Sequence, residues 1–84
     1  MAIRITTTAT ERQTILKIDG RLRADDVEEL NRAYRSVTGA TCLDLSDLQS
    51  ADRDGAAILR KLVSLGAEVC AATPYIELLL ETKA

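Results

Sequence analysis

The sequence contains no histidine, tryptophan or phenylalanine, and tyrosine, with two copies, is its only aromatic residue type. Without histidine, the chain lacks the most common general base and the most common protein ligand for transition metals. So few aromatic rings offer little surface on which bases or sugars could stack. The formal net charge is −2 with both signs interspersed, which is not the basic footprint of a nucleic-acid-binding protein. We therefore expect no enzyme, no metal, no cofactor and no nucleic-acid partner.

Long apolar runs are also missing. No run approaches the ~18 residues that a membrane span requires, and the first residues lack the apolar core of a signal peptide. We expect a cytoplasmic protein with no segment inserted in a membrane. Its 84 residues predict one domain, 1–84, and its 46% hydrophobic content, mostly Ala, Leu, Ile and Val, predicts an aliphatic core.

The two cysteines, Cys42 and Cys70, are too few and too far apart for a metal-ligand motif. Both lie in apolar segments that resemble strands, where a free cysteine behaves as a small buried hydrophobic residue. We interpret them in this way. A disulfide would suit an oxidising compartment, which nothing else in the sequence indicates.

The first third of the chain predicts a hairpin followed by a helix. The segments 3–8 and 14–19 are rich in β-branched residues and alternate, and a polar stretch joins them, which favours two antiparallel strands. A helix is expected over about 24–37, with Asp25 as its N-cap and Glu28 completing a capping box. Its apolar face consists of Val27, Leu30, Tyr34 and Val37.

The central segment predicts a strand, a loop, a helix and a second strand. Leu43–Leu45 is the first strand, an apolar helical stripe lies between residues 58 and 65, and Gly66 suits the end of that helix. Residues 67–72 form the second strand, and a right-handed crossover makes the two strands parallel. Thr73 and Pro74 then start a last helix, whose residues 78–80 either close the core or form the face of a homodimer.

These segments predict an α/β fold with the order β-β-α-β-α-β-α. We expect a mixed four-stranded sheet, made of the N-terminal antiparallel hairpin and the parallel βαβ unit, with three helices on one face.

The acidic turn before the second helix is the leading candidate site. Helix N-termini carry unpaired N–H groups and partial positive charge, so either Asp52 or Asp54 suits the cap. Arg53 does not fit this pattern, because an exposed cation at that end costs about 0.3–1 kcal/mol. A misfit on an exposed turn indicates selection for contact with another molecule rather than for stability.

Two other groups of residues are alternative candidate sites. Asp44, Asp47 and Asp52 together could hold a divalent cation, but their spacing matches no calcium loop, and we disfavour a metal site. Ser46 and Ser50 are hydroxyls beside acids, yet no histidine and no nucleophile-elbow motif is present to activate them. We therefore do not expect catalysis.

The motif Leu43-Asp44-Leu45-Ser46, then Asp52-x-x-Gly55, an Ala/Leu-rich helix and Gly66-Ala67-Glu68 resembles the STAS domain. This is the fold of bacterial anti-sigma factor antagonists, of stressosome proteins and of the cytoplasmic ends of anion transporters. The resemblance covers nearly the whole chain and is most specific between Leu43 and Gly66. It implies a protein-interaction module in transcriptional signalling, with a partner that is an anti-sigma factor and serine kinase or a related ATPase.

In the antagonists, the residue after the motif Asp is typically a Ser or Thr that the partner kinase phosphorylates to release the antagonist. Arg53 occupies this position and cannot be phosphorylated in that manner. The resemblance therefore implies partner binding through Ser50, Asp52, Arg53, Asp54, Gly55 and Ala56 without the usual switch. The opposite interpretation also stands: Asp52 and Asp54 together imitate a permanently phosphorylated state that prevents kinase binding.

Two further classes of function remain open. Small STAS proteins also resemble the accessory subunit that docks on the ATPase of an ABC-type lipid transporter. A nucleotide-binding protein is a third class, because a helix N-terminus after a strand can hold phosphate. Against it, the turn has only Gly55, and its acids would repel the ligand.

Overall fold

Nine elements make up the part of the chain that the structure, a computed structural model, describes, which is residues 3–37 and 39–81. In chain order they are β1 (Arg4–Ala9), β2 (Thr14–Leu22), the short 3₁₀-helix η1 (Ala24–Asp26), α1 (Val27–Ser36), β3 (Thr41–Leu45), β4 (Leu48–Ala51), α2 (Arg53–Ser64), β5 (Glu68–Ala72) and α3 (Pro74–Glu81). The mixed α/β class, the three α-helices and their order agree with the sequence-based prediction.

The sheet has the strand order β1-β2-β3-β5, with β4 attached to β2. β1 pairs with β2 antiparallel, as the alternating hairpin pattern predicts. β3 pairs in parallel with both β2 and β5, so the segment β3-α2-β5 forms the expected parallel crossover unit. β2 is thereby the central strand, hydrogen-bonded to β1, β3 and β4.

The predicted count of four strands is wrong, because the described residues form a five-stranded sheet. The additional strand is β4, which lies where the sequence predicts a loop before the second helix. In β4, buried Leu48 and Ala51 flank the more accessible Gln49 and Ser50. It pairs in parallel with the last residues of β2, beyond the point where β3 stops pairing. A nine-residue β2 leaves an edge there that a short segment can occupy.

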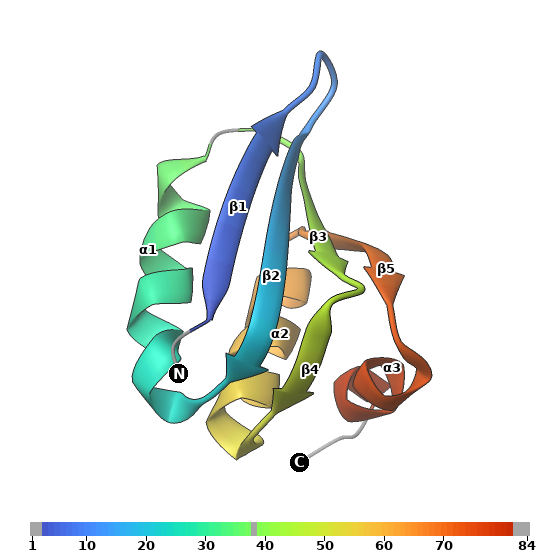
Figure 1. Cartoon of the computed structure of the whole chain (residues 1–84). Coiled ribbons are helices and arrows are strands. Elements are labelled where there is room, and N and C mark those ends of the chain that lie inside the picture. The colour runs from blue at the N-terminus through green and yellow to red at the C-terminus, as the bar shows by residue number, and fades with distance from the viewer. Residues whose placement is uncertain (1–2, 38, 82–84) are drawn as a thin grey trace.

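The core lies between the sheet and the two helices, α1 and α2, that cover one of its faces. Figure 1 shows these two helices behind the sheet, and α3 beside β4 and β5. Alternation along the strands directs one set of side chains to this face. The side chains with no exposed surface there include Leu16, Ile18 and Leu22 of β2, Leu43 and Leu45 of β3, Leu30 of α1, and Leu59 and Leu62 of α2. The expected aliphatic core is confirmed.

Helix ends follow the sequence signals with one exception. Thr73 accepts a hydrogen bond from the Ile76 N–H at 3.3 Å, and Gly66 follows α2 with a φ of 115°, as expected. The predicted N-cap Asp25 is wrong. Residues 24–26 form η1 instead, and it is Asp26 whose carboxylate accepts the Arg23 N–H at 3.0 Å. Asp26 is buried and closes this turn, whereas Asp25 is exposed.

Two surface assignments also need correction. Cys42 is buried as expected, but Cys70 is exposed, because β5 is an edge strand of the sheet. In α3, Leu79 and Leu80 pack partly against the core, whereas Leu78 is 65% exposed and does not close it.

Candidate functional site

Asp52 caps α2 and ties that helix to the segment after β2. One carboxylate oxygen accepts the Gly55 N–H at 2.8 Å, and the other accepts the Ala24 N–H at 3.0 Å. These backbone donors, with Gly55 the stronger, hold the pKa of Asp52 below its usual value. Asp52 is therefore the cap that the sequence left open between Asp52 and Asp54. The contact with Ala24 is long-range, and no local pattern in the sequence points to it.

Gly55 lets α2 approach β2 closely. A Cβ atom at this position would lie 2.5 Å from the carbonyl oxygen of Leu22 and 2.9 Å from its Cγ. The same carbonyl accepts the Asp52 N–H at 3.0 Å. The Asp-x-x-Gly spacing thus has a structural explanation, because the aspartate caps the helix while the glycine admits the strand end beneath its first turn.

Arg53 is the first residue of α2, and its side chain is exposed. Among the residues that the structure describes, nothing forms a hydrogen bond or ion pair with its guanidinium group. The Asp54 side chain is exposed beside it and accepts no hydrogen bond from the described part of the chain. The start of α2 therefore presents a free cation next to a free anion.

The six predicted site residues fall into two groups. Arg53 and Asp54 are exposed and Ser50 is half-buried, so these three side chains are accessible. Asp52 is exposed but uses both oxygens in backbone contacts, and Gly55 and Ala56 are buried. We call Ser50, Arg53 and Asp54 the α2-start surface.

A groove between α1 and α2 adjoins this surface and has a volume of about 390 Å³. Its lining residues are Ala24, Val27, Asn31, Asp54, Ala57, Ile58 and Lys61. No pattern in the sequence distinguishes this groove, because Val27 and Ile58 carry the same helical periodicity as core residues. The packing of the two helices leaves Val27 partly uncovered, whereas Ile58 is only 5% exposed.

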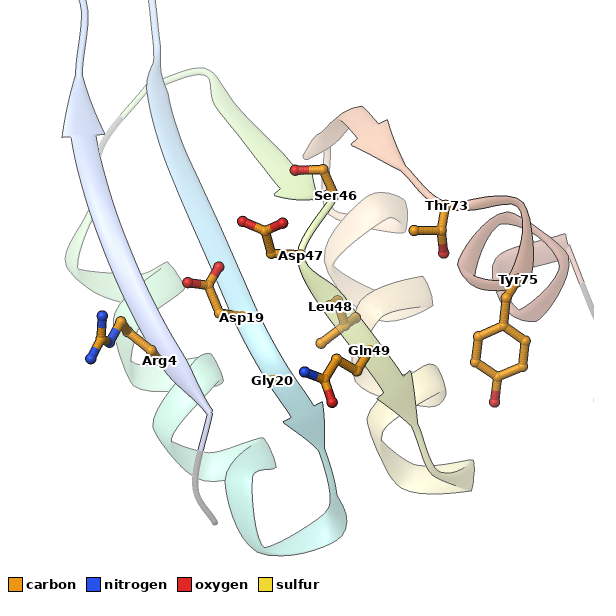
Figure 2. A pocket seen from close by; sticks show the side chains of 9 residues that line it. All are labelled: Arg4, Asp19, Gly20, Ser46, Asp47, Leu48, Gln49, Thr73 and Tyr75. Atoms are coloured by element: carbon orange, nitrogen blue, oxygen red, sulfur yellow. The ribbon is translucent and has the colours of Figure 1, made fainter.

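A second hollow of about 790 Å³ lies on the sheet face opposite α1 and α2. Figure 2 shows its nine lining residues, with the Asp19 and Asp47 carboxylates at its centre and Tyr75 of α3 at its margin. Asp47 pairs with Lys17 at 2.9 Å, and this contact is the main reason why the pKa of Lys17 is raised. Oδ1 of Asp19 is buried without a hydrogen-bond partner among the described residues.

The serine and aspartate residues considered for catalysis or metal binding each have other contacts in the structure. Ser46 donates its hydroxyl to Asp44 Oδ1 at 2.7 Å, and this contact lowers the pKa of Asp44. A carboxylate with a lowered pKa is a weak general base for activating a serine. Asp44, Asp47 and Asp52 bind Ser46, Lys17 and the α2 N-terminus respectively, and the described residues contain no cluster of three metal-ligating side chains.

No helix in the described ranges has both the length and the apolar character needed to cross a membrane.

Comparisons with known proteins identify the fold. No protein-family model and no curated protein sequence matches the chain. The structure is similar to an anti-sigma factor antagonist STAS domain from Rhodobacter sphaeroides, with 23% identity, a TM-score of 0.66, and coverage of 84% of this chain and 86% of that one. It is also similar to the anti-sigma factor antagonist SpoIIAA in its unphosphorylated form, with 14% identity, a TM-score of 0.52, and coverage of 96% and 100%.

A third similar structure is the protein Mglu, with 18% identity and a TM-score of 0.65. The match covers 82% of this chain but only 19% of Mglu, so the same fold forms one part of a longer protein there. The chain therefore has the STAS fold, and the resemblance inferred from its motif is confirmed at that level.

Proposed function

We propose that this STAS-fold chain is a non-catalytic protein-interaction module that binds a protein partner through the α2-start surface. The observation that carries this proposal is the guanidinium of Arg53 at the positive end of α2, which is exposed and has no hydrogen-bond or ion-pair partner within residues 3–37 and 39–81. Such a charge does not stabilise the helix, whereas arginine is enriched where protein interfaces concentrate their binding energy. The fold that this chain shares with two solved anti-sigma factor antagonists supports the same conclusion.

The partner that fits best is an anti-sigma factor with serine kinase activity or a member of a stressosome-type assembly. Asp52, Gly55 and Ala56 shape the surface from beneath, and Ser50, Arg53 and Asp54 contact the partner. A partner with a carboxylate opposite Arg53 would form a charge-assisted hydrogen bond, which a partner kinase could not abolish by phosphorylating residue 53.

The opposite interpretation, a permanent imitation of the phosphorylated state, rests on Asp54 alone. Both oxygens of Asp52 are occupied by the Gly55 and Ala24 N–H groups and do not face outward as a phosphate would. Arg53 stands beside Asp54 and offsets its charge, whereas a phosphate adds about −2. We therefore favour constitutive binding over constitutive release.

The binding test is a quantitative affinity capture from a native extract, comparing wild type with Arg53→Ser. Arg35→Ser serves as the control, because Arg35 is an exposed cation in the last turn of α1 and its replacement changes the net charge equally. The captured protein is then purified and titrated with each variant. We expect Arg53→Ser to weaken binding by about tenfold or more and Arg35→Ser to leave it unchanged. Equal binding by wild type and Arg53→Ser would contradict the proposal.

The same purified partner tests the switch. Incubation with the partner and ATP should leave the mass of the chain unchanged, and a phosphate on Ser50 or Ser46 would show that a switch exists elsewhere. If Arg53→Ser combined with Asp54→Ser captures a protein from the extract that wild type does not capture, the chain imitates the phosphorylated state. An ABC-type ATPase recovered as the specific partner would instead support the transporter-subunit alternative.

A further inference from the structure

The two cysteines lie on neighbouring strands at an irregularity of the sheet. β3 and β5 run parallel, with Cys42 opposite Glu68 and Leu43 opposite Val69. The next paired residues are Asp44 and Ala71, so Cys70 is the additional residue where the register shifts. Such a bulge bends its strand and redirects a side chain. Cys70 thus lies one residue beyond the Leu43–Val69 pair, diagonally across from Cys42 on the neighbouring strand.

The Cys70 side chain extends across β3. Its Sγ donates a hydrogen bond to the Leu43 carbonyl oxygen at 3.4 Å, which places the sulfur beside the residue that follows Cys42 in β3. Burial is the main reason why the pKa of Cys42 is raised to about 12, and the neighbouring Cys70 thiol adds to this shift. Diagonal neighbours in a regular sheet lie roughly 7–8 Å apart, and the additional residue at the bulge is what would bring Cys42 and Cys70 within the roughly 4.4–6.8 Å between Cα atoms that a disulfide spans.

We propose that Cys42 and Cys70 form an oxidisable dithiol that a peroxide converts to an intrachain disulfide between β3 and β5. The difference in exposure sets the order of the two steps. Cys42 is 3% exposed and stays protonated, whereas Cys70 is exposed at the sheet edge. Cys70 therefore meets the oxidant first, and Cys42 acts as the resolving thiol.

The chemistry balances with hydrogen peroxide as the oxidant. The Cys70 thiolate attacks one peroxide oxygen, an S–O bond forms, the O–O bond breaks, and hydroxide leaves and takes up a proton to give water. The Cys42 sulfur then attacks the Cys70 sulfenic acid, an S–S bond forms and the S–O bond breaks. The Cys42 proton leaves with that oxygen as a second water. Two electrons pass from the thiols to the peroxide.

The crosslink would close a ring of residues 42–70, which contains β4, the α2-start surface and all of α2. A crosslink of this kind restricts the unfolded chain and so favours the folded state. We therefore expect the oxidised protein to melt at a higher temperature than the reduced protein, and dithiothreitol to reverse the change.

Peptide mapping tests the proposal on the folded, full-length chain. The reduced protein is freed of reductant, treated with hydrogen peroxide, blocked with iodoacetamide and digested with trypsin without reduction. The expected product is a linked pair of the peptides 36–53 and 62–83, with a mass about 2 Da below their sum, and neither cysteine alkylated. Cys42→Ala should instead give a sulfenic acid at Cys70 that dimedone traps, and Cys70→Ala should leave Cys42 reduced.

The outcomes that overturn the proposal are distinct. One is a wild-type protein that accumulates only sulfenic or sulfinic acid at Cys70, because Cys42 would then not reach it. Others are a disulfide found only between two chains, or a linked peptide pair that forms only after unfolding in urea. The wild-type map decides among these results even if the Cys42→Ala variant does not fold.

Discussion

At the scale of single residues, the start of α2 contains residues that hold the local backbone in place and residues whose side chains are free to contact another molecule. Asp52 and Gly55 are fixed by backbone neighbours, the first through two N–H donors and the second through the carbonyl of Leu22. Arg53 lies between them in the sequence, and its side chain takes part in neither of these contacts. The structure thus gives separate physical reasons for the motif residues and for the residue that departs from the motif.

Replacing Gly55 with alanine tests the close approach of helix and strand. Helix propensity alone predicts that alanine stabilises a helix by up to about 1 kcal/mol relative to glycine. Because the new Cβ would lie 2.5 Å from a backbone oxygen, we expect Gly55→Ala to destabilise the protein by about 1–3 kcal/mol instead. Urea unfolding gives the sign directly. Ala57→Gly, an exposed position in the same helix, is the control and should cost about 1 kcal/mol.

The sequence predicts residues well where the cause is local. Thr73 caps α3 and Gly66 follows α2 as expected, since each signal lies within a few residues of its effect. The sequence predicts Asp25 as the N-cap, whereas Asp26 accepts the Arg23 N–H. The difference arises because a 3₁₀ turn, rather than an α-helical turn, begins the segment. The close packing of Gly55 against Leu22 is also not predictable from a local pattern, because Leu22 is distant in the sequence.

At the scale of elements, the Asp52 carboxylate joins η1 to α2. It accepts one N–H from each, so the two helical segments and the end of β2 form one connected corner. α3 is attached differently, through Arg60 of α2, whose guanidinium donates to the Leu79 carbonyl at 3.0 Å. A cation suits this position because the last carbonyl groups of a helix carry partial negative charge.

The two backbone contacts of Asp52 should make the free energy of unfolding depend on pH in the acidic range. Because the pKa of Asp52 is lower in the folded protein than in the unfolded chain, its contribution is present above the usual value of 3.8. The contribution is lost as the pH falls through the folded pKa. We therefore expect the urea midpoint to fall less steeply below pH 3.8 in Asp52→Asn than in wild type, when both are measured from neutral to strongly acidic pH.

Asp54→Asn is the matched control for this titration, since its side chain accepts no hydrogen bond among the described residues. It should keep the wild-type acid dependence. Identical profiles for wild type and Asp52→Asn would show that the two backbone contacts of Asp52 do not persist in solution.

β4 shows where element prediction from sequence reaches its limit. Four residues with two apolar positions carry too little pattern to be distinguished from a loop. The strand exists because β2 extends beyond its pairing with β3 and offers unpaired backbone groups. This partner is set by tertiary structure, so the local sequence of residues 48–51 does not reveal it.

At the scale of the whole molecule, one aliphatic core carries the stability of the chain. At about 0.05–0.15 kcal/mol per residue, 84 residues correspond to a total of roughly 4–13 kcal/mol. A single fully buried leucine contributes a large fraction of such a total. Since β1, β2, β3 and β5 share one sheet and the same core, we expect the chain to unfold as a unit.

Leu59→Ala should therefore destabilise the domain by about 2–5 kcal/mol, because Leu59 has no exposed surface and its removal leaves a cavity. Far-UV circular dichroism and tyrosine fluorescence should report the same midpoint in urea. Val63→Ala is the control on the same helix, at a position 41% exposed, and should change stability by less than about 1 kcal/mol. Separate midpoints for the two probes would show that the molecule does not unfold as a unit.

The overall topology was predictable from sequence because hydrophobic alternation and helical periodicity are strong in β1, β2, α1 and α2. The exposure of Cys70 was not, because it depends on β5 being an edge strand rather than on the apolar residues around it. The α1–α2 groove likewise arises only from packing of two helices.

The isolation of the Arg53 side chain makes position 53 a convenient handle for biophysical work. A fluorophore, a spin label or a photo-crosslinking amino acid introduced there would replace a group that forms no hydrogen bond or ion pair with any other residue that the structure describes. Such a probe would report on whatever approaches this corner, while the cap and the glycine beneath it keep the local backbone unchanged.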